Sequence, residues 1–298
     1  MPNMFDIIVC GSLHLDIVVA APHLPRVDET VPGTSWKKFC GGKGGNQAVM
    51  AARAGAKSAM IGRVGDDDFG QTLLNNLKTH HVNTDNVSVD ATHGTGVSAA
   101  ILQDDGEYGA VIVSGSNLAL KPEDAAMAWK NLGGAKYLIL QNEIPEPVNI
   151  AVAQAARKSG ARVILNAAPA REMSEQLLQL VDVLIVNRIE AEMLTGSHIT
   201  DQASALALLP KLARPNQMVV ITLGGKGLVF QTIDEQCNFI APHAVVVKSA
   251  HGAGDCFVGA LTQSLAHGND LPAACCKANF VAARFVSGQL GNHYTTDS

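Results

Sequence analysis

A carboxylate that directly follows a glycine-rich turn is the residue of this sequence best placed to do chemistry. The turn is part of the segment His251-Gly-Ala-Gly-Asp-Cys-Phe257, which leads into an apolar helical pattern. The backbone N–H groups of Gly252, Ala253 and Gly254 are predicted to point at one anion. Asp255 would then lie in the first helical turn, beside that anion's attacking partner. This combination suits phosphoryl transfer, in which a base orients a hydroxyl while donors stabilise the phosphoryl oxygens. For a lone Gly-Asp pair, the alternative is an aspartate that only complements the helix dipole.

A second glycine-rich segment, Cys40-Gly-Gly-Lys-Gly-Gly-Asn-Gln-Ala48, precedes a helical pattern that begins near Asn46. Glycines let the backbone approach a ligand closely, and a helix start offers free N–H donors. The segment is not a P-loop, because Lys43 is followed by Gly44 rather than by Ser or Thr. It also lacks the dinucleotide-binding fingerprint, whose third glycine would fall on Gln47, and this disfavours a Rossmann oxidoreductase. On these residues alone, a plain strand-to-helix turn is the alternative.

The elements that must hold these residues alternate along the chain between short apolar runs and amphipathic runs. Strands are expected at Asp6–Cys10, Ser58–Ile61, Tyr137–Leu140, Arg162–Leu165, Val183–Val186 and Met218–Leu223, and helices at Asn46–Ala54, Phe69–Thr79, Glu123–Leu132, Pro147–Lys158 and Ala203–Ala213. This alternation predicts an α/β fold, with a mostly parallel central sheet flanked by helices. We expect one domain over residues 1–298, with ligands at the carboxyl ends of the strands.

Two segments break the alternation. Asp16–Lys38 and Gly96–Val113 alternate between polar and apolar residues, and they contain the turn signals Pro25–Asp28 and Asp104–Glu107. They predict antiparallel strands or hairpins outside the main sheet, over residues of about 14–38 and 96–113. Such strands would form a small second layer over a site.

Composition narrows the classes of partner. The chain has 298 residues and a net charge of −5, without a basic excess for nucleic acid or a Lys/Arg run for a membrane surface. Small molecules are therefore the expected partners. The six cysteines show no C-x-x-C spacing, which argues against a zinc site or a disulfide framework. The start of the chain lacks a signal-peptide pattern, and no apolar run approaches the roughly 20 residues that span a bilayer, so a cytoplasmic location is expected.

Together, these motifs resemble those of the ribokinase-like carbohydrate kinases, the PfkB family. The matching segments, in chain order, are Gly41–Ala48, Gly62–Gly70, Asn187-Arg-Ile-Glu190, Thr222-Leu-Gly-Gly-Lys-Gly227 and Gly252–Asp255. The third is similar to the Asn-x-x-Glu motif of the family, and the fourth to its nucleotide loop. The resemblance covers nearly the whole chain, and within the family it is strongest to the ribokinase branch. That branch is matched through Gly11–Asp16, Gln141–Glu143 and Asn166–Ala170.

The resemblance implies an ATP-dependent, Mg²⁺-requiring kinase. It would transfer the γ-phosphate to a primary hydroxyl of a pentose, either D-ribose or a deoxy relative. A nucleoside kinase, or a kinase of another ketose or aldose, is the alternative within the family. A sugar-binding protein with little turnover is the alternative from another class. The resemblance also implies that the extra strands form a lid over the sugar, which pairs with the lid of a second subunit in a homodimer.

The resemblance further assigns roles to single residues. The implied roles are sugar binding for Asp16, Gly42, Lys43, Asn46 and Glu143; catalysis for Asp255 as base, with Gly252, Ala253 and Gly254 as the anion-binding turn; and nucleotide binding for Asn187, Glu190, Thr222, Gly224, Gly227 and Asn279. Glu190 would hold Mg²⁺ through metal-bound water, because this ion usually keeps several waters.

Some of these residues also have plainer interpretations. Asp16 is equally typical of a turn, and Glu143 of a position after a strand. Asn187 is a good N-cap, with Glu190 in the first turn of the helix that follows. Asn279, among apolar residues, could serve only to satisfy a local backbone group.

The chain departs from the family pattern at three places. Where members usually read Asp-Thr-x-Gly-Ala-Gly-Asp, the first three positions here are Ser249, Ala250 and His251. The leading aspartate helps to hold a monovalent cation in potassium-activated relatives, so K⁺ activation is doubtful for this chain. His251 would either donate a proton to a phosphate oxygen or be a neutral loop residue. His14 replaces a sugar-contacting asparagine, and the chain after Gly288 is too short for the terminal helix that members usually carry.

Overall fold

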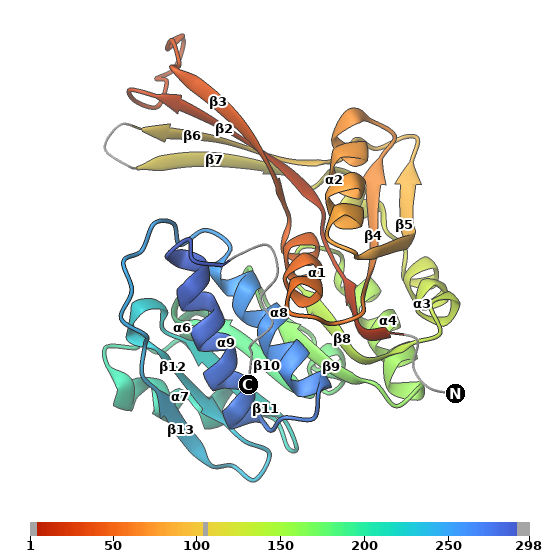
Figure 1. The fold of residues 1–298 in the computed structure, drawn as a ribbon, viewed down its shortest axis with the longest axis vertical. Coiled ribbons are helices and arrows are strands. Elements are labelled where there is room, and N and C mark those ends of the chain that lie inside the picture. Colours follow the sequence, from red (N-terminus) through yellow and green to blue (C-terminus); the bar gives the residue numbers. More distant parts are fainter. Residues whose placement is uncertain (1–4, 104–106, 291–298) are drawn as a thin grey trace.

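The main sheet confirms the predicted architecture. In the computed structural model, which describes residues 5–103 and 107–290, it contains nine strands in the order β13-β12-β11-β10-β9-β8-β1-β4-β5. The strands are β1 Phe5–Cys10, β4 Ser58–Gly65, β5 Asn83–Asp90, β8 Ala135–Gln141, β9 Arg162–Asn166, β10 Val183–Asn187, β11 Met218–Thr222, β12 Leu228–Gln231 and β13 Cys237–Ile240. All neighbouring pairs from β11 to β5 are parallel, whereas β12 and β13 run antiparallel at one edge (Figure 1).

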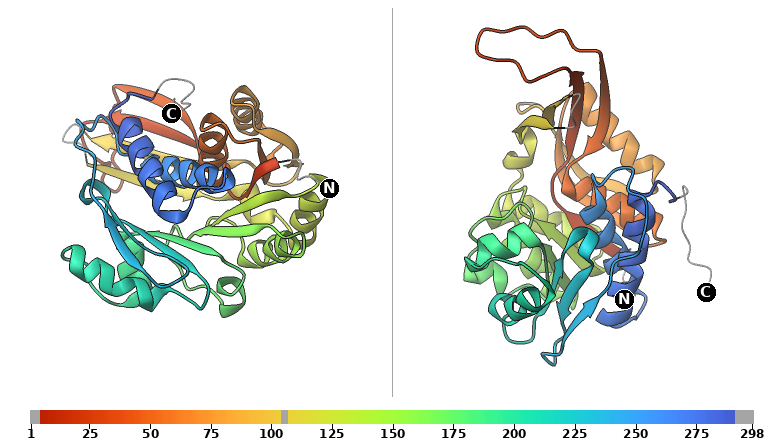
Figure 2. Two further views of the ribbon diagram at one scale, coloured as in Figure 1. Left: turned by 60° about the horizontal axis from the view of Figure 1, so that its bottom comes forward. Right: turned by 90° about the vertical axis from the view of Figure 1, so that its left-hand side faces the viewer.

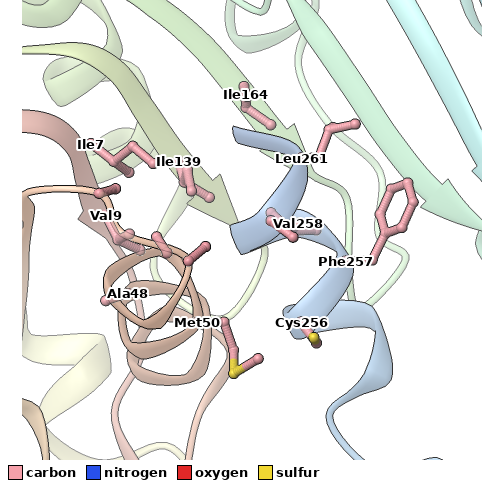
Figure 3. Packing of buried hydrophobic residues seen from close by; sticks show 14 of the residues in the cluster. Ile7, Val9, Ala48, Met50, Ile139, Ile164, Cys256, Phe257, Val258 and Leu261 are labelled. Carbon is pink, nitrogen blue, oxygen red and sulfur yellow. The ribbon is translucent and has the colours of Figure 1, made fainter. Parts of the chain in front are cut away.

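Helices cover both faces of this sheet. The first face is covered by α1 Lys43–Arg53, α2 Asp68–Thr79, α8 Ala253–Ala266 and α9 Leu271–Val286; the second by α3 Pro122–Asn131, α4 Glu146–Lys158, α5 Glu175–Leu178, α6 Arg188–Thr195 and α7 Gln202–Leu212. Successive strand residues point to opposite faces, so Ile7 and Val9 join the first apolar core and Ile8 joins the second. Figure 3 shows the first core, where β1 faces Val258 and Leu261 of α8. Burial on both faces explains the nearly continuous apolar runs of the strands.

Four strands form the predicted lid. They are β2 His14–Ala21, β3 Ser35–Gly41, β6 Gly96–Gln103 and β7 Tyr108–Val113, in the order β3-β2-β6-β7. The lid projects from the main sheet (Figures 1 and 2). Each hairpin is antiparallel as expected, but the two hairpins meet through a parallel pair, β2 with β6. The pair is parallel because each of its strands continues from a strand of the main sheet, β2 from β1 and β6 from β5. Since β1 and β5 run in the same direction, both segments leave the main sheet at the carboxyl ends of its strands.

Two polar side chains, of Asp67 and of the buried Asn117, fix the root of the lid. Asp67 caps α2, where its Oδ1 accepts from the N–H of Gly70 at 2.8 Å, and its Oδ2 accepts from the N–H of Thr95 at 2.8 Å. The side chain of Asn117 binds both backbone polar groups of Leu13. Its Oδ1 accepts from the Leu13 N–H and its Nδ2 donates to the Leu13 carbonyl, both at 2.8 Å. The motif Gly62–Gly70 therefore ties the start of β6 to the core.

Helix α1 begins at Lys43, three residues before the predicted start near Asn46. Gly44 and Gly45 are consequently helical rather than part of the turn. Packing explains this, because a Cβ at Gly44 would lie 2.6 Å from the backbone nitrogen of Ser12. The glycines let the first turn of α1 lie directly on the β1–β2 connection.

Some expectations fall outside the described residues: those on residues 1–4, on part of the second lid turn at 104–106, and on a terminal helix after 290. Within the described ranges, none of the helices has the length and apolar character needed to cross a membrane.

Candidate active site

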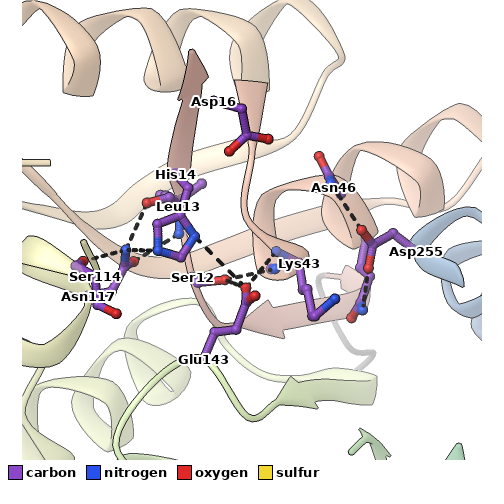
Figure 4. A network of polar contacts seen from close by, with 12 residues as sticks. Ser12, Leu13, His14, Asp16, Lys43, Asn46, Ser114, Asn117, Glu143 and Asp255 are labelled. Atoms are coloured by element: carbon purple, nitrogen blue, oxygen red, sulfur yellow. Dashed lines mark hydrogen bonds and ion pairs between the residues drawn. The ribbon is translucent and has the colours of Figure 1, made fainter. Parts of the chain in front are cut away.

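Asp255 lies in the first turn of α8, as predicted, and its carboxylate is held by two side-chain amides. Its Oδ1 accepts from Gln47 Nε2 at 2.9 Å, and its Oδ2 accepts from Asn46 Nδ2 at 3.0 Å (Figure 4). Burial raises the pKa of Asp255, whereas the positive charge of Lys43 and the two amide donors oppose that rise. The carboxylate is thus shielded from water, and the two amides hold it in one orientation. Both features suit a general base, whose pKa must match its task.

The turn before Asp255 has the shape of an anion-binding site. Gly252 is the N-cap of α8 with a φ of 78°, a left-handed conformation that favours glycine. The N–H of Ala253 donates to the carbonyl of Ala250 at 3.2 Å. In the part of the chain that the structure describes, the N–H groups of Gly254 and Asp255 have no backbone acceptor. Of the three amides expected to face an anion, that of Ala253 is therefore already engaged.

The residues expected to bind sugar gather around Glu143, which follows β8. Its Oε2 accepts a hydrogen bond from the hydroxyl of Ser12 and another from the N–H of Lys43 at 2.9 Å. Figure 4 shows the Lys43 side chain between Glu143 and Asp255, with Asp16 above them on lid strand β2. Asp16, Gly42, Lys43, Asn46 and Glu143 thus lie together at the carboxyl ends of the strands, as the sequence predicted.

Asp16 is the group that the lid contributes to this cluster. Burial raises the pKa of Asp16, and the nearby positive charge of His251, followed by that of His14, opposes the rise. The Nε2 of His251 lies 3.9 Å from the Asp16 Oδ2, so the glycine-rich turn and the lid approach each other across the site. Glycine at position 41 is required here, since a Cβ would lie 2.2 Å from the Asp16 Oδ2.

The imidazole of His14 lies between Asn117 and Glu143. Its Nε2 lies 3.4 Å from the Nδ2 of Asn117, which can only donate, so the hydrogen belongs on Nδ1. That Nδ1 points toward the Oε2 of Glu143 at 3.9 Å. Burial lowers the pKa of His14, although the neighbouring carboxylates of Glu143 and Asp16 oppose this.

Replacing His14 by Asn is therefore expected to stabilise the protein in mild acid. Below the ordinary histidine pKa of about 6.5, the unfolded chain takes up a proton that the folded chain does not, so wild-type stability falls as the pH falls. The gap between His14→Asn and wild type should widen from pH 7.5 to pH 5, up to at most about 2 kcal/mol. Urea unfolding at several pH values measures it. His198→Asn, at an exposed position, is the control and should follow wild type; a constant gap for His14→Asn would contradict the argument.

Four of the six residues expected to bind nucleotide line a cavity of about 540 Å³ between the β11–β12 turn and α8 and α9, whereas Asn187 and Glu190 are not among the described residues that line it. Thr222, Gly224, Gly227 and Asn279 all line it, together with Gly254 from the glycine-rich turn. The cavity therefore opens next to the amides that precede Asp255. Asn279 also donates from Nδ2 to the Ala241 carbonyl at 2.9 Å, which is the contact that the plainer interpretation expects, and its contact with nucleotide stays a prediction.

Asn187 and Glu190 form a capping box at the start of α6. The Asn187 Oδ1 accepts from the Glu190 N–H at 2.9 Å, and the Glu190 Oε2 accepts from the Asn187 N–H at 2.8 Å. The plainer interpretation as a cap is confirmed. Burial raises the pKa of Glu190, while the Asn187 N–H and the charge of Lys43 lower it and the charge of Asp255 raises it further. Glu190 thus lies within electrostatic reach of Asp255.

Three residues of this site were not predicted from the sequence, namely Ser12, Gln47 and Asn117. Ser12 and Gln47 lie inside segments that carried the resemblance, and this was the signal that could have found them. Asn117 had no comparable signal, because its partner Leu13 is 104 positions away. Within residues 5–103 and 107–290, no three His, Cys, Asp or Glu side chains cluster closely enough to hold a metal ion.

Comparison with known proteins agrees with this fold. The model of the pfkB family of carbohydrate kinases matches residues 4–293, so the chain belongs to that family. It is 37% identical to the ribokinase of Mus musculus over 282 residues, which cover 93% of this chain and 87% of the relative. It is 32% identical to the deoxyribokinase of Salmonella typhi, with 95% and 93% covered. The structure of Arabidopsis thaliana ribokinase with ribose and ATP superimposes with a TM-score of 0.87, at 28% identity, over 97% and 94% of the two chains.

Proposed function

We propose that this protein transfers the γ-phosphate of ATP to the primary hydroxyl of a pentose, D-ribose or a deoxy relative. The observation that carries the proposal is the position of Asp255. Its carboxylate lies at the mouth of α8, between the polar cluster around Glu143 and the cavity lined by Thr222 and Asn279. Ribokinases and a deoxyribokinase among the relatives support a pentose as the acceptor.

The proposed reaction uses the residues of this chain as follows. Asp16, Asn46 and Glu143 hold the hydroxyl groups of the sugar, since a buried site must pair every hydroxyl donor and acceptor. Asp255 orients the primary hydroxyl and accepts its proton as the oxygen attacks the γ-phosphorus. The bond between that phosphorus and the bridging oxygen of ADP breaks, and the N–H groups at the start of α8 stabilise the charge on the phosphoryl oxygens. The lid excludes water, which would otherwise compete as acceptor.

We further propose that Mg²⁺ enters this site with the nucleotide. Glu190 is the carboxylate suited to hold its water ligands, because it is buried beside Lys43 and Asp255 and uses one oxygen for the α6 cap. The ion would neutralise phosphate charge. Asn187 would serve mainly by keeping Glu190 in place.

The direct test is an assay of ADP release with Mg·ATP and a panel of D-ribose, 2-deoxyribose, hexoses and nucleosides, each with and without K⁺. Turnover with a pentose, lost when Mg²⁺ is chelated, is the expected result. Turnover only with a nucleoside or hexose would replace the proposed acceptor. Sugar binding without turnover of any acceptor would identify a binding protein instead. The K⁺ arm decides whether Ser249, in place of the aspartate usual in the family, removes cation activation.

Replacing Gly254 by Ala should separate folding from phosphate binding. A Cβ at this position meets nothing within 4 Å, and its φ is not in the left-handed region, so the variant should fold as well as wild type. The methyl group would nevertheless stand in the cavity where the phosphates are proposed to lie. We expect kcat/KM for ATP to fall about 10- to 100-fold, the effect of disturbing one such donor site, with an unchanged Tm. Gly94→Ala is the control, because its Cβ would make only an ordinary contact of 3.6 Å with Asp67 Oδ2 and Gly94 is not among the residues that line this cavity. Equal activity of both variants would place the phosphates elsewhere.

A homodimer through the lid is also part of the proposal. Several large apolar side chains of the lid are exposed, namely Trp36, Phe39, Val111, Ile112 and Val113. Monomeric proteins rarely leave such a group of apolar residues in water. Sedimentation equilibrium would give the mass in solution, and a monomer would contradict this pairing.

We infer a cytoplasmic location, which the six free cysteines support.

A further inference from the structure

We propose that Gln47 is a positioning residue, which holds the carboxylate of Asp255 in the orientation from which it accepts the proton of the sugar hydroxyl. The inference rests on the proposed role of Asp255 as base. Gln47 is fully buried on α1, whereas Asp255 lies on α8, and Gln47 is not among the described residues that line the cavity. Its part in the reaction would therefore pass through another side chain.

The hydrogen bonds of Gln47 allow only one orientation of its amide. Its Nε2 donates to the Asp255 Oδ1 at 2.9 Å and to the Asn166 Oδ1 at 3.0 Å. Its Oε1 accepts from the Nε2 of Gln141 at 2.8 Å. A flipped amide would place an oxygen against the carboxylate and against a second amide oxygen, and a nitrogen against a nitrogen. The donor side of Gln47 is thus fixed toward Asp255 before any substrate binds.

The neighbours that orient Gln47 are themselves oriented. Asn166 donates from Nδ2 to the Ile185 carbonyl at 3.3 Å, which leaves its oxygen for Gln47. Asn149 donates to the Gln141 carbonyl at 2.8 Å and so fixes the end of β8. A row of carboxamides therefore runs from α4 through the carboxyl ends of β8 and β9 to the base.

The arrangement of these carboxamides leaves one polar atom of Gln141 without a hydrogen-bond partner among the described residues. The Oε1 of Gln141 is buried and has no hydrogen-bond partner in the described part of the chain. A Cβ at Gly11 would lie 1.8 Å from that same oxygen, so only glycine leaves room for the Gln141 amide. Buried acceptors without partners are rare and call for an explanation. The explanation here is that Gln141 commits its N–H to the amide that aims Asp255.

The amide also acts on the charge of the base. Burial raises the pKa of Asp255, and the Gln47 N–H is one of the groups that oppose it. The charged groups that face Asp255 are Lys43 on α1, Glu143 after β8 and Glu190 on α6. None of these changes when Gln47 is replaced. Loss of the amide should therefore raise the pKa of Asp255 further and leave more of the base protonated at neutral pH.

The test is the pH dependence of kcat in Gln47→Met and Gln47→Glu. Met keeps the size of the side chain without donors, and Glu can keep the hydrogen-bond pattern while protonated, so it covers the case in which Gln47→Met does not fold. We expect kcat near pH 7 to fall about tenfold or more, with the acid limb of the profile moved up by about 1 to 2 pH units, the size of one hydrogen bond to a charged group. KM for ATP should stay near the wild-type value. The shift should be larger for Gln47→Glu, where two carboxyl groups titrate as a pair.

Gln217→Met is the matched control. Gln217 is also a buried amide, and its Nε2 donates to the Leu178 and Val181 carbonyls. It directly precedes β11 and so lies at the amino ends of the strands, opposite the end at which Asp255 lies. It should lose stability without a change in the pH profile of kcat. Profiles of both Gln47 variants that superimpose on wild type, or an equal shift in Gln217→Met, would overturn the inference. If Asp255→Asn remains active, the proposed base is wrong; if that variant is inactive while the Gln47 profiles are unshifted, only the positioning role fails.

Discussion

Replacement of Asp255 by Asn is expected to lower kcat about 10²- to 10⁴-fold, the range attributed to a positioned acid or base. The affinity for ATP should change little, because the base acts mainly in the transition state. The fold should persist, since an Asn oxygen can still accept from one of the two amides that hold this side chain. Initial rates of ADP release and equilibrium binding of ATP measure the two effects separately.

The control for this variant is Asp124→Asn. Asp124 also lies in the first turn of a helix, α3, where its charge complements the helix dipole. Removing such a charge changes stability by about 0.3–1 kcal/mol and should leave activity intact. If Asp255→Asn behaves like Asp124→Asn, the carboxylate at 255 is an ordinary first-turn residue and the kinase mechanism must use another base.

Replacement of Gly44 by Ala is expected to destabilise the protein by about 3 kcal/mol or more, at the upper end of the range for overpacked cores. The added Cβ would lie 2.6 Å from the nitrogen of Ser12 and 2.7 Å from the carbonyl carbon of Gly11. Both are backbone atoms, so α1 must move away from the β1–β2 connection. That movement would separate Lys43 from Glu143 and raise KM for the sugar as well. Urea unfolding and sugar kinetics test the two consequences.

Gly45→Ala provides the comparison within the same helical turn. Its Cβ would lie 2.8 Å from Leu13 Cδ2, the end of a flexible side chain that can rotate away. Alanine is also favoured over glycine inside a helix by about 1 kcal/mol. We therefore expect Gly45→Ala to be close to wild type. Equal stability of the two variants would mean that the close approach of α1 to Ser12 is not a constraint.

The strands that are buried on both faces of the sheet could be predicted from the sequence. Strands such as β1, β8 and β10 carry continuous apolar runs because helices cover both of their faces. Strand β5 was not predicted, since it lies at the edge of the sheet and its sequence, Asn-Thr-Asp-Asn-Val-Ser-Val-Asp, is mostly polar. Strands β12 and β13 are only four residues each, too short for a clear pattern. The start of α1 was misplaced because tertiary packing outweighs the low helix propensity of Gly44 and Gly45.

The candidate site was predictable in its residue types and less so in its contacts. Glycine turns next to Asp255 and Lys43 indicated ligand-binding loops, and the structure brings them together. The partners of those residues depend on long-range packing: Gln47 meets Asp255 at a separation of 208 positions, and Ser12 meets Glu143 at 131. No local pattern encodes such pairs. The engagement of the Ala253 N–H by Ala250 likewise depends on the detailed path of the turn.

The parallel pairing of β2 with β6 has a consequence for the order in which parts of the protein can fold during synthesis. Residues 14–21 and 96–103 can pair only after the intervening chain, which carries α1, β4, α2 and β5, has been synthesised, because this pairing closes a long loop. Asp255 and α8 emerge later still from the ribosome. A nascent chain can therefore pair β2 with β6 before Asp255, the proposed base, has been synthesised.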